Sequence, residues 1–343
     1  MGIKDLAMSF MARARPLFTG LLAGCLVLGI DSASLNTWAQ SRANTPQIGI
    51  LSFGPPPTGT DADPERGVRQ GLRELGYVEG RNVSVVRRYA DGKPDLLAAQ
   101  AADLVRLNVD VILAGGPSTL EAARKATSSI PIVTISGSDP VEAGWAESLA
   151  HPGGNVTGVT VTFPELDLKR LEILKEAFPA ITRVAVLTDF GPDQRFKDRR
   201  EAGARRLGLE LQFIAAPHED DIERAFAIAR QGRAQALMAV ATNAIVTNRS
   251  RLAALAQADR IVSVSEFPLM AQAGFLLTYG ADLDDLGRQS MVQIDKILKG
   301  ARAADLPIER PTKFRLVVNL KTAKALGLSI PQSLLSRADD VIR

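Results

Sequence analysis

The sequence predicts an α/β protein made of two doubly wound parallel-sheet lobes, joined by a hinge that the chain crosses several times. The main observation is an internal repeat. Residues 47–119 read as strand, helix, strand, helix, strand and a small polar cap, and residues 182–244 repeat this order. Leu75-Gly76 and Leu207-Gly208 end the corresponding first helices. The length of 343 residues also fits two domains better than one.

The first half of the chain alternates apolar strands with amphipathic helices. Residues 48–51 form an apolar run typical of a buried parallel strand. Asp63-Pro64 places an N-cap residue and a proline where the first helix begins, and Gly76 ends this helix. The other elements predicted here are strands at 82–89, 109–114 and 130–136 and helices at 94–107 and 117–127. We expect the glycine-rich segment 139–158 to cross between the lobes.

The second half repeats the pattern and then continues beyond it. The predicted elements that flank and follow the repeat are helices at 163–178, 244–258, 283–298 and 320–326 and strands at 261–264, 275–279 and 314–319. The residues after Gly274 exceed what the second lobe needs, so we expect the chain to re-enter the first lobe and later return. The expected lobes are 46–156 with about 280–312, and 157–279 with about 313–343.

The first 39 residues have the order of a secretory signal peptide. Three basic residues precede an apolar stretch at 17–30, and small residues lead to Ala39. This stretch of about 14 residues is shorter than the roughly 20 that a membrane span needs, so we expect export and cleavage near Ala39. Leu22-Ala23-Gly24-Cys25 is similar to a lipoprotein box, but the apolar run continues past it. Lipidation of Cys25 is therefore the minority alternative.

Composition and missing motifs exclude several kinds of site. Cys25 is the only cysteine, so a chain cleaved near Ala39 has none for disulfides, metal thiolates or a nucleophile. His151 and His218 are the only histidines, which disfavours a histidine metal cluster or triad. The sequence contains no G-x-S-x-G elbow and no P-loop. A net charge of +3 gives no support to nucleic-acid binding. We expect no catalytic residue, metal, cofactor or nucleic-acid partner.

Polar and aromatic residues follow the strands of both lobes. In open parallel sheets, ligands bind beyond the carboxyl ends of the strands, near helix N-termini. The candidate ligand-binding residues at these positions are Ser52, Phe53, Gly116, Ser118, Thr119, Ser136, Asp139, Thr188, Asp189, Phe190, Thr242, Asn243, Glu266, Tyr279 and Asp282. The shared position of these residues, more than any single one, predicts a small-molecule site.

Several of these residues have both a ligand-binding and a structural interpretation. The N–H groups that follow Gly116 can hold a carboxylate or phosphate, whereas Gly116 and Ser118 can equally serve only to cap a helix. The acidic residues Asp189, Glu266 and Asp282 can receive an ammonium group. The aromatic residues Phe53, Phe190 and Tyr279 can cover apolar or ring surface. Structurally, Asp282 can be a simple helix cap and Phe190 can belong to the core of a lobe.

The chain resembles the substrate-binding proteins of ABC transporters, in the branch related to tryptophan and tyrosine uptake receptors. The resemblance covers essentially all residues after the signal peptide. It implies the type I periplasmic-binding-protein fold. The residues that carry it lie at 71–83, 114–117, 130–133, 139–141, 152–159, 279–280, 297–300 and 318–327.

The resemblance implies a monomeric periplasmic receptor that captures a small organic solute between its lobes and presents it to an ABC permease in the inner membrane. An amino acid, another carboxylate or an aromatic compound is the expected solute class. Relatives that bind aromatic amino acids often carry Asp-Asn where this chain has Thr242-Asn243, and Asn-Pro where it has Asp189-Phe190, so the solute stays open. The alternatives are a periplasmic sensor for a membrane signalling protein and an enzyme that uses the same cleft.

Overall fold

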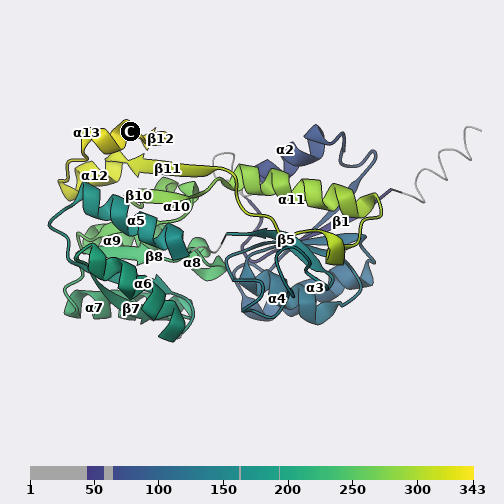
Figure 1. Cartoon of the computed structure of the whole chain (residues 1–343), viewed down its shortest axis with the longest axis horizontal. Helices are drawn as coiled ribbons and strands as arrows, with labels where there is room; N and C mark the ends of the chain where they lie inside the picture. The colour runs from purple at the N-terminus through teal and green to yellow at the C-terminus, as the bar shows by residue number, and fades with distance from the viewer. Residues whose placement is uncertain (1–44, 58–64, 162–163, 193) are drawn as a thin grey trace, which may run out of the picture. The chain divides into compact units, whose positions relative to one another are not determined.

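The computed structural model describes residues 45–57, 65–161, 164–192 and 194–343 (Figure 1). The expected signal peptide at 1–39, with Cys25, lies outside the described residues, and so does the helix start expected at Asp63-Pro64. Residues 46–343 form one unit by their internal contacts. Among the described helices, none is both long and apolar enough to cross a membrane.

The N-terminal sheet has five parallel strands in the order β2-β1-β3-β4-β5. Its strands are β1 (Gln47–Ser52), β2 (Ser84–Tyr89), β3 (Val111–Gly115), β4 (Ile132–Ser136) and β5 (Val156–Thr160). Helices connect the first four strands in sequence: α2 (Arg66–Glu74), α3 (Pro94–Arg106) and α4 (Pro117–Ala126). This alternation confirms the βα units predicted for the first repeat.

The C-terminal sheet has seven strands in the order β12-β11-β10-β9-β8-β6-β7. Its strands are β6 (Arg183–Thr188), β7 (Glu210–Ala215), β8 (Ala236–Ala239), β9 (Val262–Ser265), β10 (Leu277–Ala281), β11 (Phe314–Asn319) and β12 (Asp340–Ile342). Its helices are α5 (Pro164–Ala177), α6 (Gln194–Arg206), α7 (Ile222–Gln231), α8 (Asn243–Thr247), α9 (Arg249–Ala258), α10 (Pro268–Gln272), α12 (Leu320–Leu326) and α13 (Gln332–Leu335). Short 3₁₀ turns lie at Glu219–Asp221 and Ala303–Asp305. The predicted fold class, two α/β lobes with parallel sheets, is confirmed.

One strand pair departs from the expected parallel arrangement. β11 runs antiparallel to β10. The reason lies in the chain path, because α11 (Leu283–Leu298) packs against α2 in the N-terminal lobe. The chain leaves the second sheet at the carboxyl end of β10 and re-enters it at that same end, so the returning strand runs in the opposite direction.

The first crossing between the sheets comes later than expected. The prediction that 139–158 crosses between the lobes is wrong, because β5 pairs in parallel with β4 as a fifth strand. Segment 303–309 also stays with the N-terminal sheet, since Ile308 is buried in its core and Glu309 bridges to Val159. We propose 46–160 with 283–309 as the N-terminal lobe and 164–281 with 314–343 as the C-terminal lobe.

The helix expected at 244–258 is divided in two. Asn248 separates α8 from α9 with φ −90° and ψ 12°. Its side-chain Nδ2 donates to the Ala244 carbonyl at 3.1 Å, and such local bonds compete with regular helix geometry. α10, α13 and β12 were not predicted because each has at most five residues. As a result, α8 is a separate short helix that follows β8.

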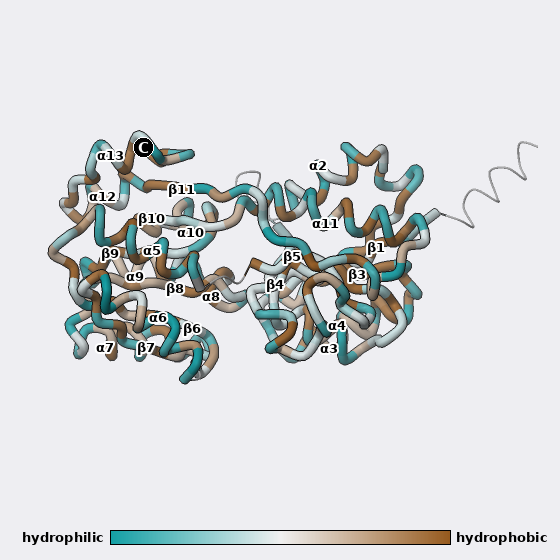
Figure 2. The backbone as a smooth tube through the Cα atoms, viewed as in Figure 1, coloured by the Kyte–Doolittle hydropathy of each residue, from teal (hydrophilic) through white to brown (hydrophobic). Residues whose placement is uncertain are grey.

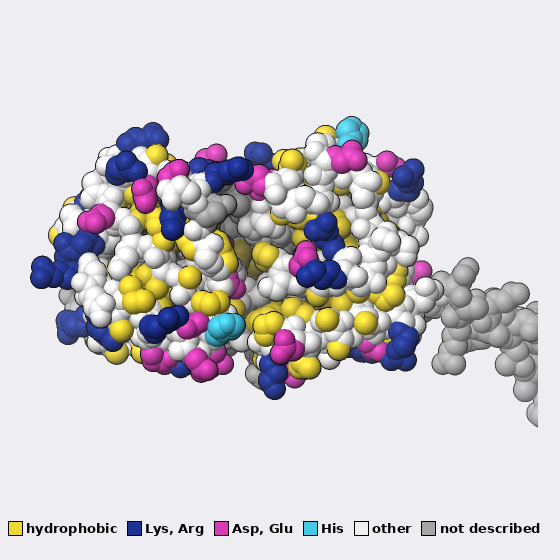
Figure 3. Space-filling view, turned by 90° about the horizontal axis from the view of Figure 1, so that it is seen from below, with side chains coloured by type: hydrophobic (Ala, Val, Ile, Leu, Met, Phe, Trp, Pro, Cys, Tyr) yellow, Lys and Arg dark blue, Asp and Glu magenta, His cyan; other side chains and the backbone are white. Residues whose placement is uncertain are grey.

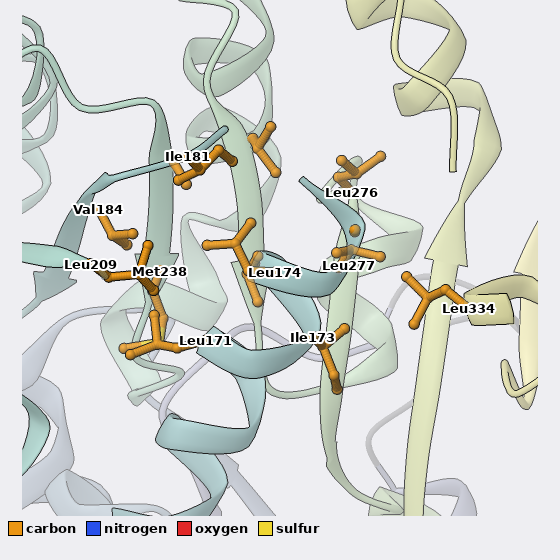
Figure 4. Close-up of a cluster of buried hydrophobic side chains, with 14 of the residues drawn as sticks. Leu171, Ile173, Leu174, Ile181, Val184, Leu209, Met238, Leu276, Leu277 and Leu334 are labelled. Carbon is orange, nitrogen blue, oxygen red and sulfur yellow. The ribbon is translucent and has the colours of Figure 1, made fainter. Parts of the chain in front are cut away.

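Hydrophobic residues cover both faces of each sheet. Alternate residues of β6 belong to two different core clusters, with Val184 and Val186 on one face and Ala185 and Leu187 on the other. Strands buried on both faces read as continuous apolar runs, and the hydrophobic stretches in Figure 2 include β3 and β8. Figure 4 shows Leu171 and Leu174 of α5 beside side chains of the second sheet. On the face of the molecule that Figure 3 shows, positively and negatively charged side chains are interspersed.

Glycines allow α2 and α11 to pack closely. A Cβ added at Gly67 would lie 2.3 Å from the Asp284 carbonyl oxygen, and one at Gly71 would lie 2.9 Å from the Met291 side chain. Arg66 forms an ion pair with the Asp284 side chain at the same contact. Because α11 returns from the other lobe, this backbone contact fixes where the returning chain docks.

We expect Gly67→Ala to lower the free energy of unfolding by about 1–3 kcal/mol, since overpacking at a rigid backbone contact forces the two helices apart. Urea-induced unfolding measures this change. Gly154→Ala is the matched control, because a Cβ at Gly154 meets nothing within 4 Å. Equal stabilities of the two variants would contradict the close packing of α2 and α11.

Candidate functional site

The N-terminal lobe presents the first group of candidate residues at the carboxyl ends of β1 and β3. Ser52 is half-buried at the end of β1, whereas Phe53 is only 6% exposed and belongs to the core. Thr119 is fully buried, and its hydroxyl donates to the carbonyls of Gly115 and Gly116 at 2.8 and 2.9 Å. Phe53 and Thr119 thus support the edge, while half-buried Ser118 and Gly116 remain at its surface.

The turn after β4 is stabilised by its own side chains. The Ser136 and Ser138 hydroxyls lie 2.8 Å apart. The exposed Asp139 accepts hydrogen bonds from the backbone N–H groups of Val141 and Glu142, both at 2.9 Å. These bonds place Ser136 and Asp139 at the same edge of the sheet as Gly116, with Asp139 acting as a turn cap.

The C-terminal lobe places an acidic residue at the end of β6. Burial raises the pKa of Asp189, while hydrogen bonds from the Thr242 side chain and the Ala244 backbone oppose this shift. Thr242 also caps α8, because its hydroxyl accepts from the Ile245 N–H at 3.5 Å. The structure therefore brings Asp189 and Thr242 together.

An aromatic group borders this carboxylate. Phe190 is 39% exposed and meets Phe196 edge to face, with 5.4 Å between ring centroids. The buried Thr188 hydroxyl donates to the Phe190 carbonyl at 2.6 Å and fixes the loop. Phe190 keeps part of its ring accessible, in contrast to the core placement that was the structural alternative.

Asn243 joins the polar ends of the two lobes. Its Nδ2 donates to the Gly115 carbonyl at 3.0 Å. Gly116 has a φ of 98°, and a Cβ added there would lie 2.0 Å from the Asn243 Oδ1. That Oδ1 is buried and has no hydrogen-bond partner among the described residues. Glycine at 116 is therefore needed both for its backbone conformation and for the space that Asn243 occupies.

Glu266 belongs to a buried charge cluster, which we define as Asp167, Arg170, Arg200 and Glu266. Its Oε1 accepts from the Ala241 N–H at 3.3 Å and lies 3.6 Å from an Arg170 nitrogen. Asp167 forms ion pairs with both arginines. Burial raises the pKa of Glu266, and the charge of Arg170 opposes this shift. Through Glu266, the cluster contacts the loop that carries Thr242.

Sequence reasoning missed three of the four residues of this cluster. Asp167 and Arg170 are spaced i, i+3 on α5, a spacing that usually indicates a solvent-exposed pair. Arg200 lies on α6 among many exposed charges, yet it is 8% exposed, with its guanidinium carbon 3.3 Å from the Phe196 ring centroid. Only the packing of α5 against α6 reveals that these charges are buried.

Tyr279 and Asp282 lie at the crossing that follows β10. The Tyr279 ring stacks on Phe314 with centroids 6.2 Å apart. Asp282 caps α11 by accepting from the N–H groups of Asp284 and Asp285 at 2.9 and 3.1 Å. A role as helix cap accounts for these contacts of Asp282. The ligand-binding role predicted for Asp282 is therefore supported only by its position.

The combined edge offers donors and acceptors suited to a small zwitterion. The first-turn N–H groups of Ser118 and Thr119 have no acceptor within α4, because the first turn of any helix lacks them. Asp189 supplies a carboxylate on the opposite lobe, whereas the Glu266 carboxylate is engaged by Ala241 and Arg170. Among the described residues, no group of three or more His, Cys, Asp or Glu could hold a metal ion.

Comparisons with known proteins point in one direction. Residues 60–342 match the family described as ABC transporter substrate binding protein. A tyrosine-binding protein of Clostridioides difficile is 25% identical over 90% of this chain and 88% of its own length. The ABC domain from Streptococcus pneumoniae in complex with L-Trp has 26% identity and a TM-score of 0.78, covering 87% of this chain and all of that one. A conserved domain protein from Vibrio cholerae has 25% identity and the same TM-score over 87% and 99%.

We expect Asp167→Ala to lower the free energy of unfolding by about 3–5 kcal/mol, because it removes the carboxylate that pairs with both buried guanidinium groups and leaves Glu266 as the remaining carboxylate of the cluster. Urea-induced unfolding provides the measurement. Glu172→Ala, which breaks an exposed pair with Lys169 on the same helix, should change stability by less than about 1 kcal/mol. A small effect for both variants would mean that the cluster is hydrated rather than buried.

Proposed function

Because this chain belongs to the ABC transporter substrate-binding proteins, we propose that it is an extracytoplasmic receptor that captures an amino acid or similar small solute for an ABC-type importer. The observation that carries the proposal is the Asn243–Gly115 hydrogen bond, which brings the polar strand ends of both lobes within reach of one molecule. The fold is that of type I periplasmic binding proteins. Ligand contacts to both lobes stabilise a closed form, which a permease can then recognise.

We assign the solute class from the charges at the two edges. Asp189, partly withdrawn from water, suits an ammonium group, and the N-terminus of α4 suits a carboxylate. The accessible ring of Phe190 suits an aromatic or apolar side chain. Two relatives point to the same class, since one is a tyrosine-binding protein and another is in complex with L-Trp. An aromatic amino acid is therefore the first candidate.

The family and the N-terminal sequence support a proposal for the cellular location and the partners. The segment at 1–39 has the features of an export signal, which suits a periplasmic monomer that meets a permease in the inner membrane. A receptor needs no chemical step, so no residue is assigned to catalysis.

Native mass spectrometry of the purified protein, followed by calorimetry, tests this function. We expect a retained or added ligand of amino-acid mass, with L-tryptophan, L-tyrosine and L-phenylalanine tested first. Tryptamine lacks the carboxylate and indole-3-propionate lacks the ammonium group, so each should bind more weakly than L-tryptophan. Failure of a folded protein to bind any amino acid or small carboxylate would overturn the proposal.

We expect Asp189→Asn to weaken binding of an ammonium ligand by about 10-fold to 100-fold, the effect of losing one charged hydrogen bond. The pKa of Asp189 is raised above its ordinary 3.8, so affinity should be full at neutral pH and should fall as the pH drops through this raised pKa. Titrations between pH 7 and pH 4 measure the profile. A profile that Asp189→Asn leaves unchanged would assign the ammonium contact elsewhere, with Glu266→Gln as the next variant.

A further inference from the structure

We propose that α8 is a latch that holds the two lobes together through contacts between protein groups alone. The latch consists of Asn243, Ala244 and Thr247 of the C-terminal lobe, seated on a glycine-lined surface of the N-terminal lobe. The seat is formed by Gly54, Gly92, Gly115 and Gly116. These contacts require no solute, so they set the balance between separated and closed lobes before any ligand binds.

The seat fits α8 because it lacks side chains. A Cβ at Gly92 would come within 3.3 Å of the Thr247 methyl group, and one at Gly54 would lie 3.8 Å from the Thr247 hydroxyl. Ala244 packs against the core cluster of the N-terminal lobe. Asn243, Ala244 and Thr247 thus lie on one side of α8. They contact the carboxyl ends of β1, β2 and β3 or the loops that follow these strands. A side chain at Gly92 or Gly116 would crowd α8, whereas a Cβ at Gly115 would meet nothing within 4 Å.

Asn243 is the directional contact of the latch. Its Nδ2 donates to the Gly115 carbonyl, and its Oδ1 is buried without a partner among the described residues. A hydrogen bond between the two lobes forms only when the lobes are in contact. It therefore stabilises the closed state and not the open state. We treat Asn243 as a positioning residue, because the contact it makes is to the protein.

An ion pair provides a second contact at another place on the lobe boundary. Glu142, in the turn after β4, accepts from Arg199 at 2.7 Å and from Arg195 at 3.4 Å, both on α6. All three side chains are more than a third exposed. Surface pairs of this kind are weak and are screened by salt. The α8 seat therefore supplies the larger and salt-independent part of the closing force.

The latch has a measurable effect on solute affinity, and this part rests on the proposed function. When only the closed form binds tightly, the apparent dissociation constant is inversely proportional to the closed fraction. Removing the latch should therefore raise the dissociation constant by the same factor as it lowers the closed population, although no latch residue need touch the solute.

Small-angle X-ray scattering of the purified protein without added solute tests the latch directly. We expect Asn243→Ala to increase the radius of gyration and to reduce the ratio of closed to open molecules by about 5-fold to 10-fold, as expected for one lost hydrogen bond. Asn248→Ala is the matched control, because its Nδ2 donates to Ala244 within the same helix segment. Asn243→Asp, which keeps the size but sets an acceptor against the Gly115 carbonyl, should open the protein as well.

The ion pair is tested by Glu142→Gln, with Glu201→Gln as control because Glu201 pairs with Arg205 inside α6. Glu142→Gln should open the protein slightly at low salt and have no effect in 1 M salt, where the Debye length is about 3 Å. Circular dichroism and thermal melting confirm that each variant is folded.

Two outcomes would overturn the latch. One is a radius of gyration that Asn243→Ala and Asn243→Asp leave equal to that of Asn248→Ala. The other is a loss of solute affinity in Asn243→Ala with no change in scattering, since this would make Asn243 a direct solute contact. The scattering measurement needs no solute, so failure to find a ligand would count against the proposed function and leave the latch result intact.

Discussion

Coverage of both faces of each parallel sheet is the constraint on which the rest of the structure depends. Helices bury the faces, so the strands present mainly aliphatic side chains there, and polar chemistry is confined to the strand ends. At the carboxyl ends, chain direction places the loops of many strands together. The candidate site follows from this arrangement, because Gly116, Asp189 and Glu266 come directly after buried strands and Asn243 begins the helix that follows β8.

The sequence was most informative where periodicity is strong. α11 and β11 were predicted with their observed bounds, Leu283–Leu298 and Phe314–Asn319, since long amphipathic or apolar stretches specify their own type. β5 was missed because its neighbourhood is rich in glycine and reads as a loop. Gly158 lies inside that strand, and a Cβ there would be 2.0 Å from the Thr134 carbonyl oxygen. Such a glycine marks a close backbone approach, which a single sequence does not separate from a turn.

The candidate site was predictable in position but not in partners. Thr242 and Asn243 were expected beyond β8, yet which residues of the other lobe they meet depends on how two separately folded sheets come together. The burial of Arg170 and Arg200 was not predicted, for a different reason. Their neighbours in sequence are charged and solvated, and their burial comes from the packing of α5 and α6. These arginines pair with the carboxylates of Asp167 and Glu266, and Glu266 in turn accepts from the backbone of the Thr242 loop.

The route of the chain has a mechanical consequence. Three connections join the two sheets, one after β5, one after β10 and one before β11, and the last two run side by side through the bond from the Asp282 N–H to the Lys313 carbonyl. Parallel tethers of this kind resist twisting and sliding but permit bending about a single axis. Each approach of one lobe to the other must therefore retrace nearly the same arc, so the amide of Asn243 returns to the same carbonyl on every cycle.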